Sequence, residues 1–395
     1  MLSERINRLA ESETLAMARK SRELKALGHQ VINLSIGEPD FFTPDKVKAA
    51  AKLAIDNNES FYTPVNGNLD LREAICEKLK RDNQLSYQPG QVVVSTGAKQ
   101  SIANAMLCLV NPGEEVIVPT PYWVSYREMI KMAEGKEVVI STNLEQDYKI
   151  TPQQLEAAIT PASKVFIFSS PCNPSGSVYT HDELHALSKV FERHPHVYII
   201  SDEIYELINF SGQHASLAQF PAIHDRVVLI NGVSKGFAMT GWRVGYMAAH
   251  ETIAQACTKF QGQVTSGTCS IAQKAALEAM RTHPSETRHM LEKFKERRDL
   301  LTGLLQDIPG INTNKPQGAF YLFPDVKAYF GRSDGHTTIE HASDLCMHIL
   351  NKAYVAMVPG DAFGNPGCIR ISYATSNELL IEAVNRIKQV LASLQ

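Results

Sequence analysis

The amino-acid sequence predicts an α/β protein whose main unit is a mostly parallel sheet covered by helices, followed by a smaller α+β unit. Six apolar, β-branched runs of strand length occur between residues 91 and 249, and helical patterns separate several of them. These runs are continuously apolar rather than alternating, which indicates strands buried on both faces. After about residue 285 this pattern gives way to a long charged helix and short strands. A length of 395 residues also favours two domains over one.

The first unit alternates strands and helices along the chain. Runs such as QVVVSTG and KVFIFSS are rich in β-branched and aromatic residues, which favour strands. The segments between them have the spacing of apolar residues that is typical of helices. The predicted strands cover residues 91–97, 114–120, 164–170, 197–203, 226–232 and 242–249, and the predicted helices cover 99–110, 126–135 and 180–194.

The second unit begins with a charged helix over residues 285–308, continues with short strands at 318–324 and 367–374, and ends in an amphipathic helix. The N-terminal arm includes INLSIGEPDFFTP, whose glycine and prolines cannot continue a helix or a central strand, so we expect the arm to pack with this unit. We therefore predict an arm with part of the small domain over 1–45, a large domain over 46–285 and a small domain over 286–395.

Composition and charge argue against several classes of protein. A net charge of −3 without a Lys/Arg run disfavours a nucleic-acid partner. The seven cysteines are scattered without a Cys-x-x-Cys or zinc-like spacing, so we expect reduced thiols and no metal site. The N-terminus lacks a signal-peptide core, and no uncharged apolar run approaches the roughly 20 residues of a membrane span. We expect a cytoplasmic protein that does not bind a membrane.

Ligands of open α/β sheets bind at the carboxyl ends of the strands, so polar segments at those ends are candidate sites. STGAKQ, residues 95–100, is a small-residue turn before a helix, where backbone N–H groups favour an anion such as phosphate. An ordinary turn with a glycine at positive φ is the alternative interpretation. The glycine-rich fingerprints of dinucleotide and nucleoside-triphosphate sites do not occur in the sequence.

Four further polar or aromatic residues follow predicted strands. Trp123 suits either core packing or stacking on a planar ligand. Asn173 lies between two prolines in SSPCNPSG, which suits either a rigidly held amide or a plain turn. Asp202 ends an apolar strand, with Tyr205 three residues later. A carboxylate there either caps the next helix or pairs with a cation, such as a protonated ring nitrogen.

The segment SKGFAMTGWRVGY places Lys235 among small and apolar residues, with Arg243 at the beginning of the next predicted strand. A lone lysine in a loop usually points into water. A lysine desolvated near other cations has a depressed pKa and becomes a nucleophile toward aldehydes. Arg243 has the geometry to bind phosphate. Arg370, flanked by isoleucines in GCIRISYA, is placed to bind a carboxylate by two parallel hydrogen bonds.

Together these residues supply an amine that can form an imine, a carboxylate that can pair with a pyridine nitrogen and an aromatic ring that can stack on a planar ligand. They also supply a phosphate site and an arginine that can bind a carboxylate. Those are the parts needed to bind pyridoxal phosphate and to perform carbanion chemistry on an amino acid. From GEPDFFTP through YTPVNG, NPSG and SKGFAMTGWRVGY to RISYA, the chain closely resembles the class I aminotransferases of fold type I, in the bacterial aspartate aminotransferase branch. The resemblance implies a seven-stranded, mostly parallel sheet in the large domain and a homodimer with shared active sites.

The resemblance also implies roles for the residues that match the family's motifs. Lys235 is expected to hold the cofactor as a Schiff base and to move the α-proton of the substrate. Asp202 is expected to keep the pyridine nitrogen protonated, and Trp123 to stack on the ring. Tyr205 and Asn173 are expected to donate hydrogen bonds to the phenolic oxygen of the ring.

The remaining roles concern the phosphate and the substrate. The resemblance implies that Arg370 binds the substrate α-carboxylate, and that Lys99 both adjoins the cofactor and meets the distal carboxylate of a dicarboxylic substrate. Lys99 as a solvated helix-terminus residue is the alternative. The phosphate is expected to bind at Gly97, Ala98, Ser234 and Arg243 and at Tyr62 from the other subunit, and the substrate carboxylate also at Asn173, Trp123 and the backbone of Gly37.

The predicted reaction transfers the amino group of L-aspartate to 2-oxoglutarate in a ping-pong cycle, giving oxaloacetate and L-glutamate. Related enzymes that also use prephenate carry an arm lysine where Ala10 and Glu11 stand here, which argues against prephenate. The alternatives are an aminotransferase of broader or different amino-donor range, a β-lyase or decarboxylase using the same cofactor, and a non-catalytic regulator. About 30 residues before INLSIGEPD are too few for a regulator's DNA-binding module.

Overall fold

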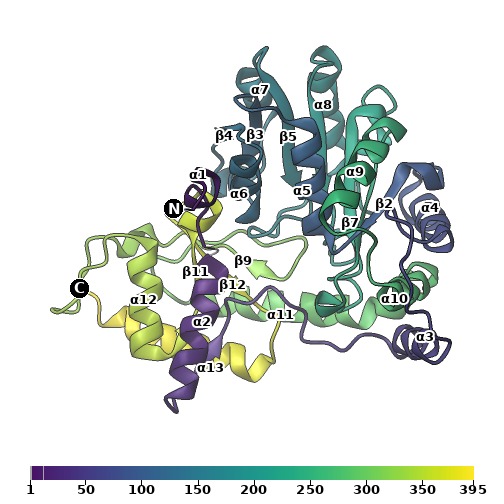
Figure 1. Cartoon of the computed structure of the whole chain (residues 1–395). Helices are drawn as coiled ribbons and strands as arrows, with labels where there is room; N and C mark the ends of the chain where they lie inside the picture. Colours follow the sequence, from purple (N-terminus) through teal and green to yellow (C-terminus); the bar gives the residue numbers. More distant parts are fainter. Residues whose placement is uncertain (1, 12) are drawn as a thin grey trace.

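The computed structural model describes residues 2–11 and 13–395. A seven-stranded sheet carries helices on both sides, and a smaller unit of short strands and long helices lies beside it (Figure 1). The strands of the large sheet are β2 (Val92–Ser95), β3 (Glu115–Pro119), β4 (Lys136–Ile140), β5 (Ser163–Ser169), β6 (Tyr198–Asp202), β7 (Val227–Gly232) and β8 (Gly245–Ala248). Their order across the sheet is β2-β8-β7-β6-β5-β3-β4.

Only β8 runs against the other strands of this sheet, since it pairs antiparallel with both β2 and β7 while the remaining pairs are parallel. Parallel pairing requires crossover connections, and helices supply most of them here. The α/β class and the mostly parallel sheet are therefore confirmed. The helices of this unit are α3 (Asp45–Asp56), α4 (Leu69–Asn83), α5 (Ala98–Leu109), α6 (Ser125–Met132), α7 (Pro152–Ala158), α8 (His181–Arg193), α9 (Glu251–Val264) and α10 (Ser270–Arg281).

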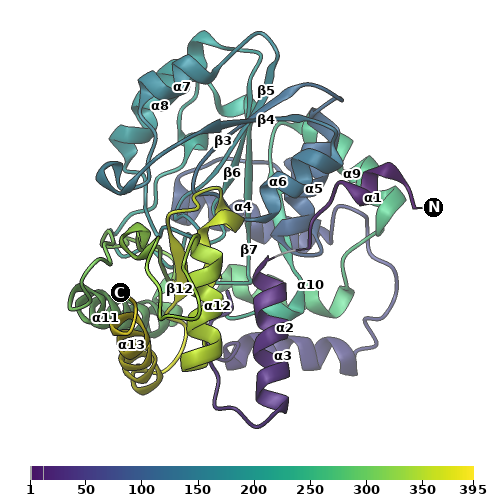
Figure 2. The same cartoon turned by 90° about the vertical axis from the view of Figure 1, so that its left-hand side faces the viewer.

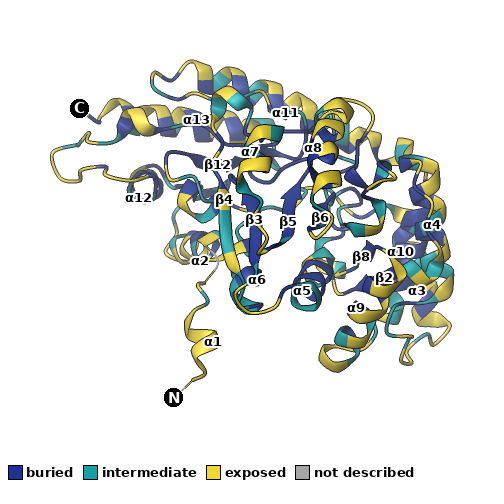
Figure 3. Cartoon of the chain, turned by 90° about the horizontal axis from the view of Figure 1, so that it is seen from above, coloured by how far each residue is buried: buried dark blue, intermediate teal, exposed yellow. Residues whose placement is uncertain are grey.

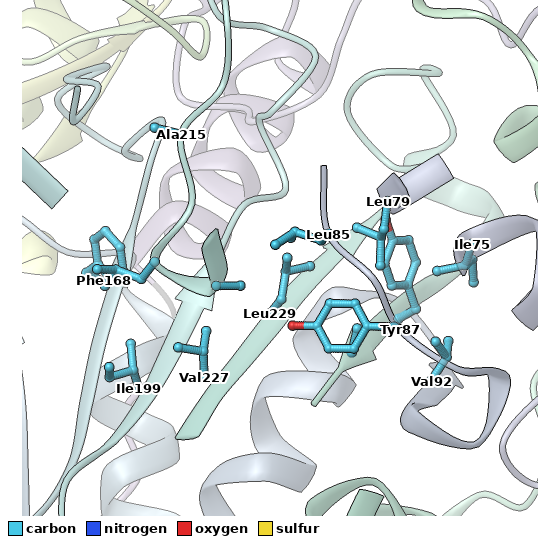
Figure 4. Close-up of a cluster of buried hydrophobic side chains, with 14 of the residues drawn as sticks. Ile75, Leu79, Leu85, Tyr87, Val92, Phe168, Ile199, Ala215, Val227 and Leu229 are labelled. Carbon is cyan, nitrogen blue, oxygen red and sulfur yellow. The ribbon is translucent and has the colours of Figure 1, made fainter. Parts of the chain in front are cut away.

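The pattern of apolar residues explains why the strands form and which faces they cover. Val92 and Val94 point into one hydrophobic cluster, whereas Val93 between them points into the cluster on the opposite face. Val227, Ile199 and neighbouring side chains of the first cluster gather on one face of the sheet (Figure 4). Burying one such side chain stabilises the fold by about 1.5–3 kcal/mol.

The predicted strands differ from the structure in two places: one strand is missing from the prediction, and one predicted strand begins too early. β4 was not predicted from the residues, because this edge strand is partly exposed and its sequence KEVVI has charges in place of a continuous apolar run. Figure 3 shows exposed and intermediate residues along β4, beside the buried β3. The strand predicted over 242–249 begins only at Gly245, because Arg243 adopts a left-handed conformation with φ of 55°. Arg243 thus precedes the strand instead of beginning it.

The smaller unit contains a three-stranded antiparallel sheet of order β11-β12-β9 and a parallel pair, β1 with β10. Pairing of β1 with β10 places residues 32–33 of the N-terminal arm beside residues 355–356. The division of domains at residues 45 and 285 stays a prediction. The elements of this unit are α2 (Glu13–Ala26), β1 (Ile32–Asn33), α11 (Arg288–Gln306), β9 (Tyr321–Leu322), α12 (Ala342–Ala353), β10 (Val355–Ala356), β11 (Val358–Pro359), β12 (Ile369–Ser372) and α13 (Asn377–Ala392). The short helix α1 (Glu4–Asn7) lies apart from them, with Arg5 3.7 Å from Glu134 of the large unit.

The small unit has its own hydrophobic cluster, to which α2, α11, α12 and α13 contribute. Figure 2 shows α12 and α13 side by side, with α2 near them, at the end of the molecule away from α7 and α8. None of the helices in the described part of the chain combines the length and apolar character that a membrane span requires.

Candidate active site

A cavity of about 390 Å³ lies where the carboxyl edge of the large sheet meets the small unit. Strands β2, β3, β5, β6 and β7 all end at this edge, and β9 and β12 of the small unit lie beside it (Figure 1). The sheet therefore brings together loops that are far apart in the chain. Of the residues singled out in the sequence, the cavity is lined by Gly37, Ala98, Lys99, Trp123, Asn173, Asp202, Tyr205, Ser234, Lys235, Arg243 and Arg370.

Lys235 lies in the loop after β7, with its amine directed into the cavity. Its Nζ donates a hydrogen bond of 2.6 Å to the backbone oxygen of Gly37. Burial lowers the pKa of Lys235 to about 8, and the positive charges of Arg370 and Arg243 act in the same direction. The negative charges of Glu38 and Asp202 oppose the shift without cancelling it. The amine is therefore neutral in a substantial fraction of molecules near pH 8, as a nucleophile or base requires.

Asp202 ends strand β6 and is buried against the cavity. Its Oδ2 accepts a hydrogen bond of 2.6 Å from the hydroxyl of Tyr126, and its Oδ1 accepts one of 3.3 Å from the backbone N–H of Ile204. Burial raises the pKa of Asp202 to about 6, whereas these hydrogen bonds and the charge of Lys235 lower it. No ion pair joins Asp202 to a cation among the described residues, so the carboxylate is positioned to pair with a cationic ligand atom.

Arg370 comes from β12 of the small unit and is only 2% exposed. Its Nη1 donates a hydrogen bond of 3.0 Å to Oδ1 of Asn173, and its Nη2 donates one of 2.6 Å to the backbone oxygen of Ser35. Nε has no hydrogen-bond partner among the described residues. A buried guanidinium without a carboxylate partner, at the wall of a cavity, is suited to binding an anionic ligand group.

An anion site is formed where β2 leads into α5. Gly97 precedes the helix with φ of 83°, and no side chain caps the helix N-terminus. A Cβ on Gly97 would lie 2.2 Å from Nη2 of Arg243, so only glycine allows the guanidinium to come this close. Arg243 also donates a hydrogen bond of 2.9 Å to the backbone oxygen of Thr240, which fixes it at the cavity. Free N–H groups, the helix dipole and a guanidinium together favour a phosphate-sized anion.

Trp123 and Lys99 lie at the side of the same cavity. The Trp123 ring meets the Tyr126 ring edge to face, with centroids 5.6 Å apart and an interplanar angle of 88°. Nζ of Lys99 lies 4.9 Å from the centroid of the Trp123 ring. Burial, and then the charge of Arg243, lower the pKa of Lys99. Lys99 thus contacts the cavity and is not a purely solvated lysine.

The geometry agrees with what comparison to known proteins finds. Residues 29–387 match a family model described as aminotransferase class I and II. The chain belongs to this aminotransferase family. It is 46% identical to an aspartate/prephenate aminotransferase of Cereibacter sphaeroides, over 100% of this chain and 99% of that protein. It is 43% identical to an aspartate aminotransferase of Bacillus subtilis, over 98% of both chains.

Two solved aminotransferase structures superpose closely on the chain. The aspartate aminotransferase of Rhizobium meliloti does so with a TM-score of 0.96 at 40% identity, covering 100% of both chains. That of Thermus thermophilus with maleate does so with a TM-score of 0.92 at 37% identity, covering 99% of both chains. The predicted family, and the fold implied by the resemblance, are therefore confirmed.

Three residues of this aminotransferase site were not identified from the sequence. Tyr126 donates to Asp202, Tyr321 lies 2.7 Å from Tyr205 between their hydroxyl oxygens, and the backbone oxygen of Ser35 accepts from Arg370. Tyr126 and Tyr321 lie in the segments PYWVSY and GAFY, and nothing in those segments distinguishes them from core tyrosines. Contacts between segments far apart in the chain were needed to identify them, and that of Tyr321 with Tyr205 joins the small unit to the large one.

Two of the predicted site residues do not line the cavity. Gly97 lies directly behind it, against the guanidinium of Arg243. Tyr62 lies in the segment between α3 and α4 and is 100% exposed. Its predicted contact is with another subunit, so that contact stays a prediction. Within the described residues, no group of three or more histidine, cysteine or acidic side chains is arranged to hold a metal ion.

The lowered pKa of Lys235 predicts a distinct pH profile for modification of its amine in the cofactor-free protein. Because only the neutral amine reacts, modification should rise through about pH 8 and then level off. Lys327, whose pKa is raised by its hydrogen bond with Asp325, should still gain reactivity at higher pH. Mass spectrometry of the two lysine-containing peptides after timed labelling between about pH 6 and 10 measures both profiles. Parallel profiles for the two lysines would contradict the prediction.

Proposed function

We propose that this aminotransferase transfers the amino group of L-aspartate to 2-oxoglutarate with pyridoxal phosphate as cofactor, releasing oxaloacetate and L-glutamate. The observation that carries the proposal is the convergence of Lys235, Asp202 and Arg370 on one cavity. An amine of lowered pKa, a buried carboxylate and a buried guanidinium are the three charged groups that this chemistry requires. The names of the relatives support the choice of aspartate.

The residues around the cavity fit the cofactor. The carboxylate of Asp202 lacks a cationic partner in the described chain, which suits a protonated pyridine nitrogen. Gly97 and Arg243 form the anion site that suits the phosphate, together with Ala98 and Ser234. When bound, pyridoxal phosphate supplies an electron-withdrawing ring that stabilises negative charge at the substrate α-carbon. Trp123 would stack on that ring, and Asn173 and Tyr205 would donate to its phenolic oxygen.

Lys235 carries the proton transfer in the proposed mechanism. Its Nζ, hydrogen-bonded to the backbone oxygen of Gly37, is available as a base once the amine is neutral. With the cofactor bound, the neutral Nζ of Lys235 would accept the α-proton of the amino acid and would then donate a proton again, and the half-reaction as a whole would consume one water and release the 2-oxo acid. The second half of the cycle runs in reverse with 2-oxoglutarate. Both halves use the same site, which is why ping-pong kinetics are expected.

Arg370 binds the α-carboxylate of both substrates in this proposal. Replacing it by alanine should raise KM for aspartate and for 2-oxoglutarate by about 10²-fold, because two charge-assisted hydrogen bonds are lost. Arg370→Lys should recover only part of the loss, since lysine keeps the charge but not the planar fork. Steady-state kinetics with both substrates varied measure the effect. A large fall in kcat with both KM values unchanged would contradict this role.

Lys99 determines the substrate class in the proposal, by meeting the distal carboxylate of dicarboxylic substrates. Its Nζ lies beside Trp123, and both Lys99 and Arg370 line the cavity. Tyr62, fully exposed on the single chain, would reach the phosphate of the partner subunit in a homodimer. The arm does not carry the lysine expected for prephenate, because Ala10 and Glu11 stand at that place. We also propose a cytoplasmic location.

A half-reaction assay tests the proposed function directly. Adding L-aspartate to the cofactor-loaded protein, without a 2-oxo acid, should rapidly bleach the absorbance of the bound cofactor, whereas L-methionine, L-phenylalanine and L-alanine should act slowly. Lys99→Ala should weaken the response to aspartate by about tenfold or more and leave the response to alanine nearly unchanged, since only aspartate has a distal carboxylate. Prephenate added afterwards should restore the absorbance poorly compared with 2-oxoglutarate.

The same assay separates the alternative functions. Release of ammonia with pyruvate, or of carbon dioxide, without a 2-oxo acid acceptor would indicate a lyase or a decarboxylase. Faster bleaching by the apolar amino acids would retain the aminotransferase chemistry and remove the assignment of aspartate. If the protein stays colourless after addition of pyridoxal phosphate, the assignment of this cofactor would be wrong as well.

A further inference from the structure

Tyr321 occupies the junction between the proposed cofactor site and the proposed substrate site. It lies in β9 of the small unit, is fully buried and lines the cavity. Its hydroxyl oxygen lies 2.7 Å from that of Tyr205, which comes from the loop after β6. Its ring centroid lies 4.5 Å from Cζ of Arg370. Tyr321 therefore contacts both Tyr205, which is assigned to the cofactor, and Arg370, which is assigned to the substrate.

The contact between the two hydroxyls restricts where their hydrogens can point. Each phenol has one hydrogen to donate, and neither Tyr205 nor Tyr321 has another hydrogen-bond partner among the described residues. If Tyr205 donates its hydrogen to a charged ligand oxygen, Tyr321 is left as the donor to Tyr205. Donation into the Tyr205 oxygen polarises its O–H bond and strengthens the outer hydrogen bond. The Tyr321 hydroxyl is thus placed to reinforce donation by Tyr205 toward the cavity.

The ring of Tyr321 contacts a different group, the guanidinium of Arg370. Cζ of the Arg370 guanidinium lies over this ring and also over that of Phe363, whose centroid is 5.0 Å away. The cation is attracted to both ring faces, and contact with two rigid rings restricts the positions that the guanidinium can take. Nη1 and Nη2 then point at Asn173 and Ser35 along the cavity wall.

Gly37 packs closely against the hydroxyl of Tyr321. A Cβ added to Gly37 would lie 2.6 Å from the Tyr321 hydroxyl oxygen. The backbone oxygen of Gly37 also accepts the hydrogen bond of Lys235. The Tyr321 hydroxyl is therefore enclosed by the arm on one side and by Tyr205 on the other, which leaves it little freedom to turn away.

We propose that Tyr321 is a positioning residue with two separable roles: its hydroxyl directs the hydrogen of Tyr205 toward the cofactor, and its ring orients Arg370 for the substrate carboxylate. The inference rests on the proposed function, because both ligands are those of a pyridoxal phosphate aminotransferase. It adds a residue that links the two ligand sites across the two structural units. The two roles predict different effects for substitutions that remove the hydroxyl alone or the whole aromatic side chain.

Tyr321→Phe tests the hydroxyl role, because it keeps the ring and removes only the oxygen. Weaker donation by Tyr205 should raise the pKa of the bound cofactor chromophore, measured by absorbance titration without substrate, by about 0.5 to 1 pH unit. Tyr373→Phe is the matched control. Tyr373 is an equally buried tyrosine of the same small sheet region, and its hydroxyl donates to the backbone oxygen of Ala319 at 3.1 Å. The control should leave the chromophore pKa unchanged.

Tyr321→Leu tests the ring role, with maleate as the probe of Arg370. The dissociation constant for maleate, measured from the absorbance change of the loaded protein, should rise about 5- to 30-fold in Tyr321→Leu and less than about 2-fold in Tyr321→Phe. Tyr321→Met, which fills a similar volume without a ring, replaces the leucine variant if that variant does not fold. Equal maleate affinity in the phenylalanine and leucine variants would overturn the ring role.

The outcomes separate this inference from the proposed function. If the unmodified protein does not take up pyridoxal phosphate or bind maleate, the proposed function fails. If it does both, but Tyr321→Phe leaves the chromophore pKa unchanged or lowers it, the hydroxyl role alone is wrong. A shift of the same size in Tyr373→Phe would also overturn that role, since it would show a general response to a lost buried hydroxyl.

Discussion

Replacing Lys235 by alanine is expected to lower kcat for aspartate and 2-oxoglutarate by more than about 10⁴-fold. The amine is the group at the cavity with a pKa lowered to about 8, and its hydrogen bond to Gly37 holds it in place. The variant removes both the nucleophile that would attach the cofactor and the base that would move the α-proton. Single-turnover and steady-state assays with the cofactor-loaded variant measure the loss.

Lys235→Arg serves as the control for charge in that experiment. Arginine keeps a positive charge in the cavity but has no amine that becomes neutral near pH 8. If the role of Lys235 is chemical, arginine should be nearly as inactive as alanine. Recovery of most of the activity by arginine would show that only the charge matters. Full activity in Lys235→Ala would contradict the proposed mechanism.

Asp202→Asn is expected to give the second largest effect, a fall in kcat of about 10³-fold. The amide keeps the shape of the carboxylate and can still accept the hydrogen bond from Tyr126. It lacks the negative charge that would hold a proton on the pyridine nitrogen. KM for the two substrates should change much less, since the substrate carboxylate is assigned to Arg370. Steady-state kinetics measure this split.

A neighbouring carboxylate provides the matched control for Asp202. Glu203 is equally buried, but it accepts hydrogen bonds from Ser201 and Ser216 and pairs with His214 at 2.8 Å, and it does not line the cavity. Glu203→Gln should lower the thermal midpoint while changing kcat less than about 3-fold. If the two variants lost similar activity, buried charge in this loop would matter only for stability, and the assignment of Asp202 would be wrong.

The sequence was informative wherever a site residue depends on the end of a single strand. Asp202, Lys235 and the turn at Gly97 each follow a strand whose continuous apolar run is visible in the sequence. Because such strands are buried and parallel, their carboxyl ends must meet at one edge, and the structure brings Asp202, Lys235 and the residue after Gly97, Ala98, to one cavity. Their chemical roles are predictions from residue type and family resemblance.

The sequence was less informative where burial does not follow from the local pattern. β4 has charges in its sequence because it is an edge strand with one exposed side, so no apolar run marked it. The sequence places Arg243 in the next strand because the run WRVGYMAA, residues 242–249, has the length and composition of a strand. The left-handed turn at Arg243, which brings its guanidinium to Gly97, depends on contact between two segments and not on either alone.

By itself, the sequence determined the fold class, the family and the set of chemical groups, because strand burial, turn residues and motifs are local properties. Only the tertiary structure decided which of these groups touch. The hydrogen bond from Lys235 to Gly37 joins residues 198 positions apart, and that from Arg370 to Ser35 joins residues 335 apart. The contact of Tyr321 with Tyr205 likewise joins the small unit to the large sheet. Such contacts arise from the packing of whole elements against one another, which no local pattern of residues specifies.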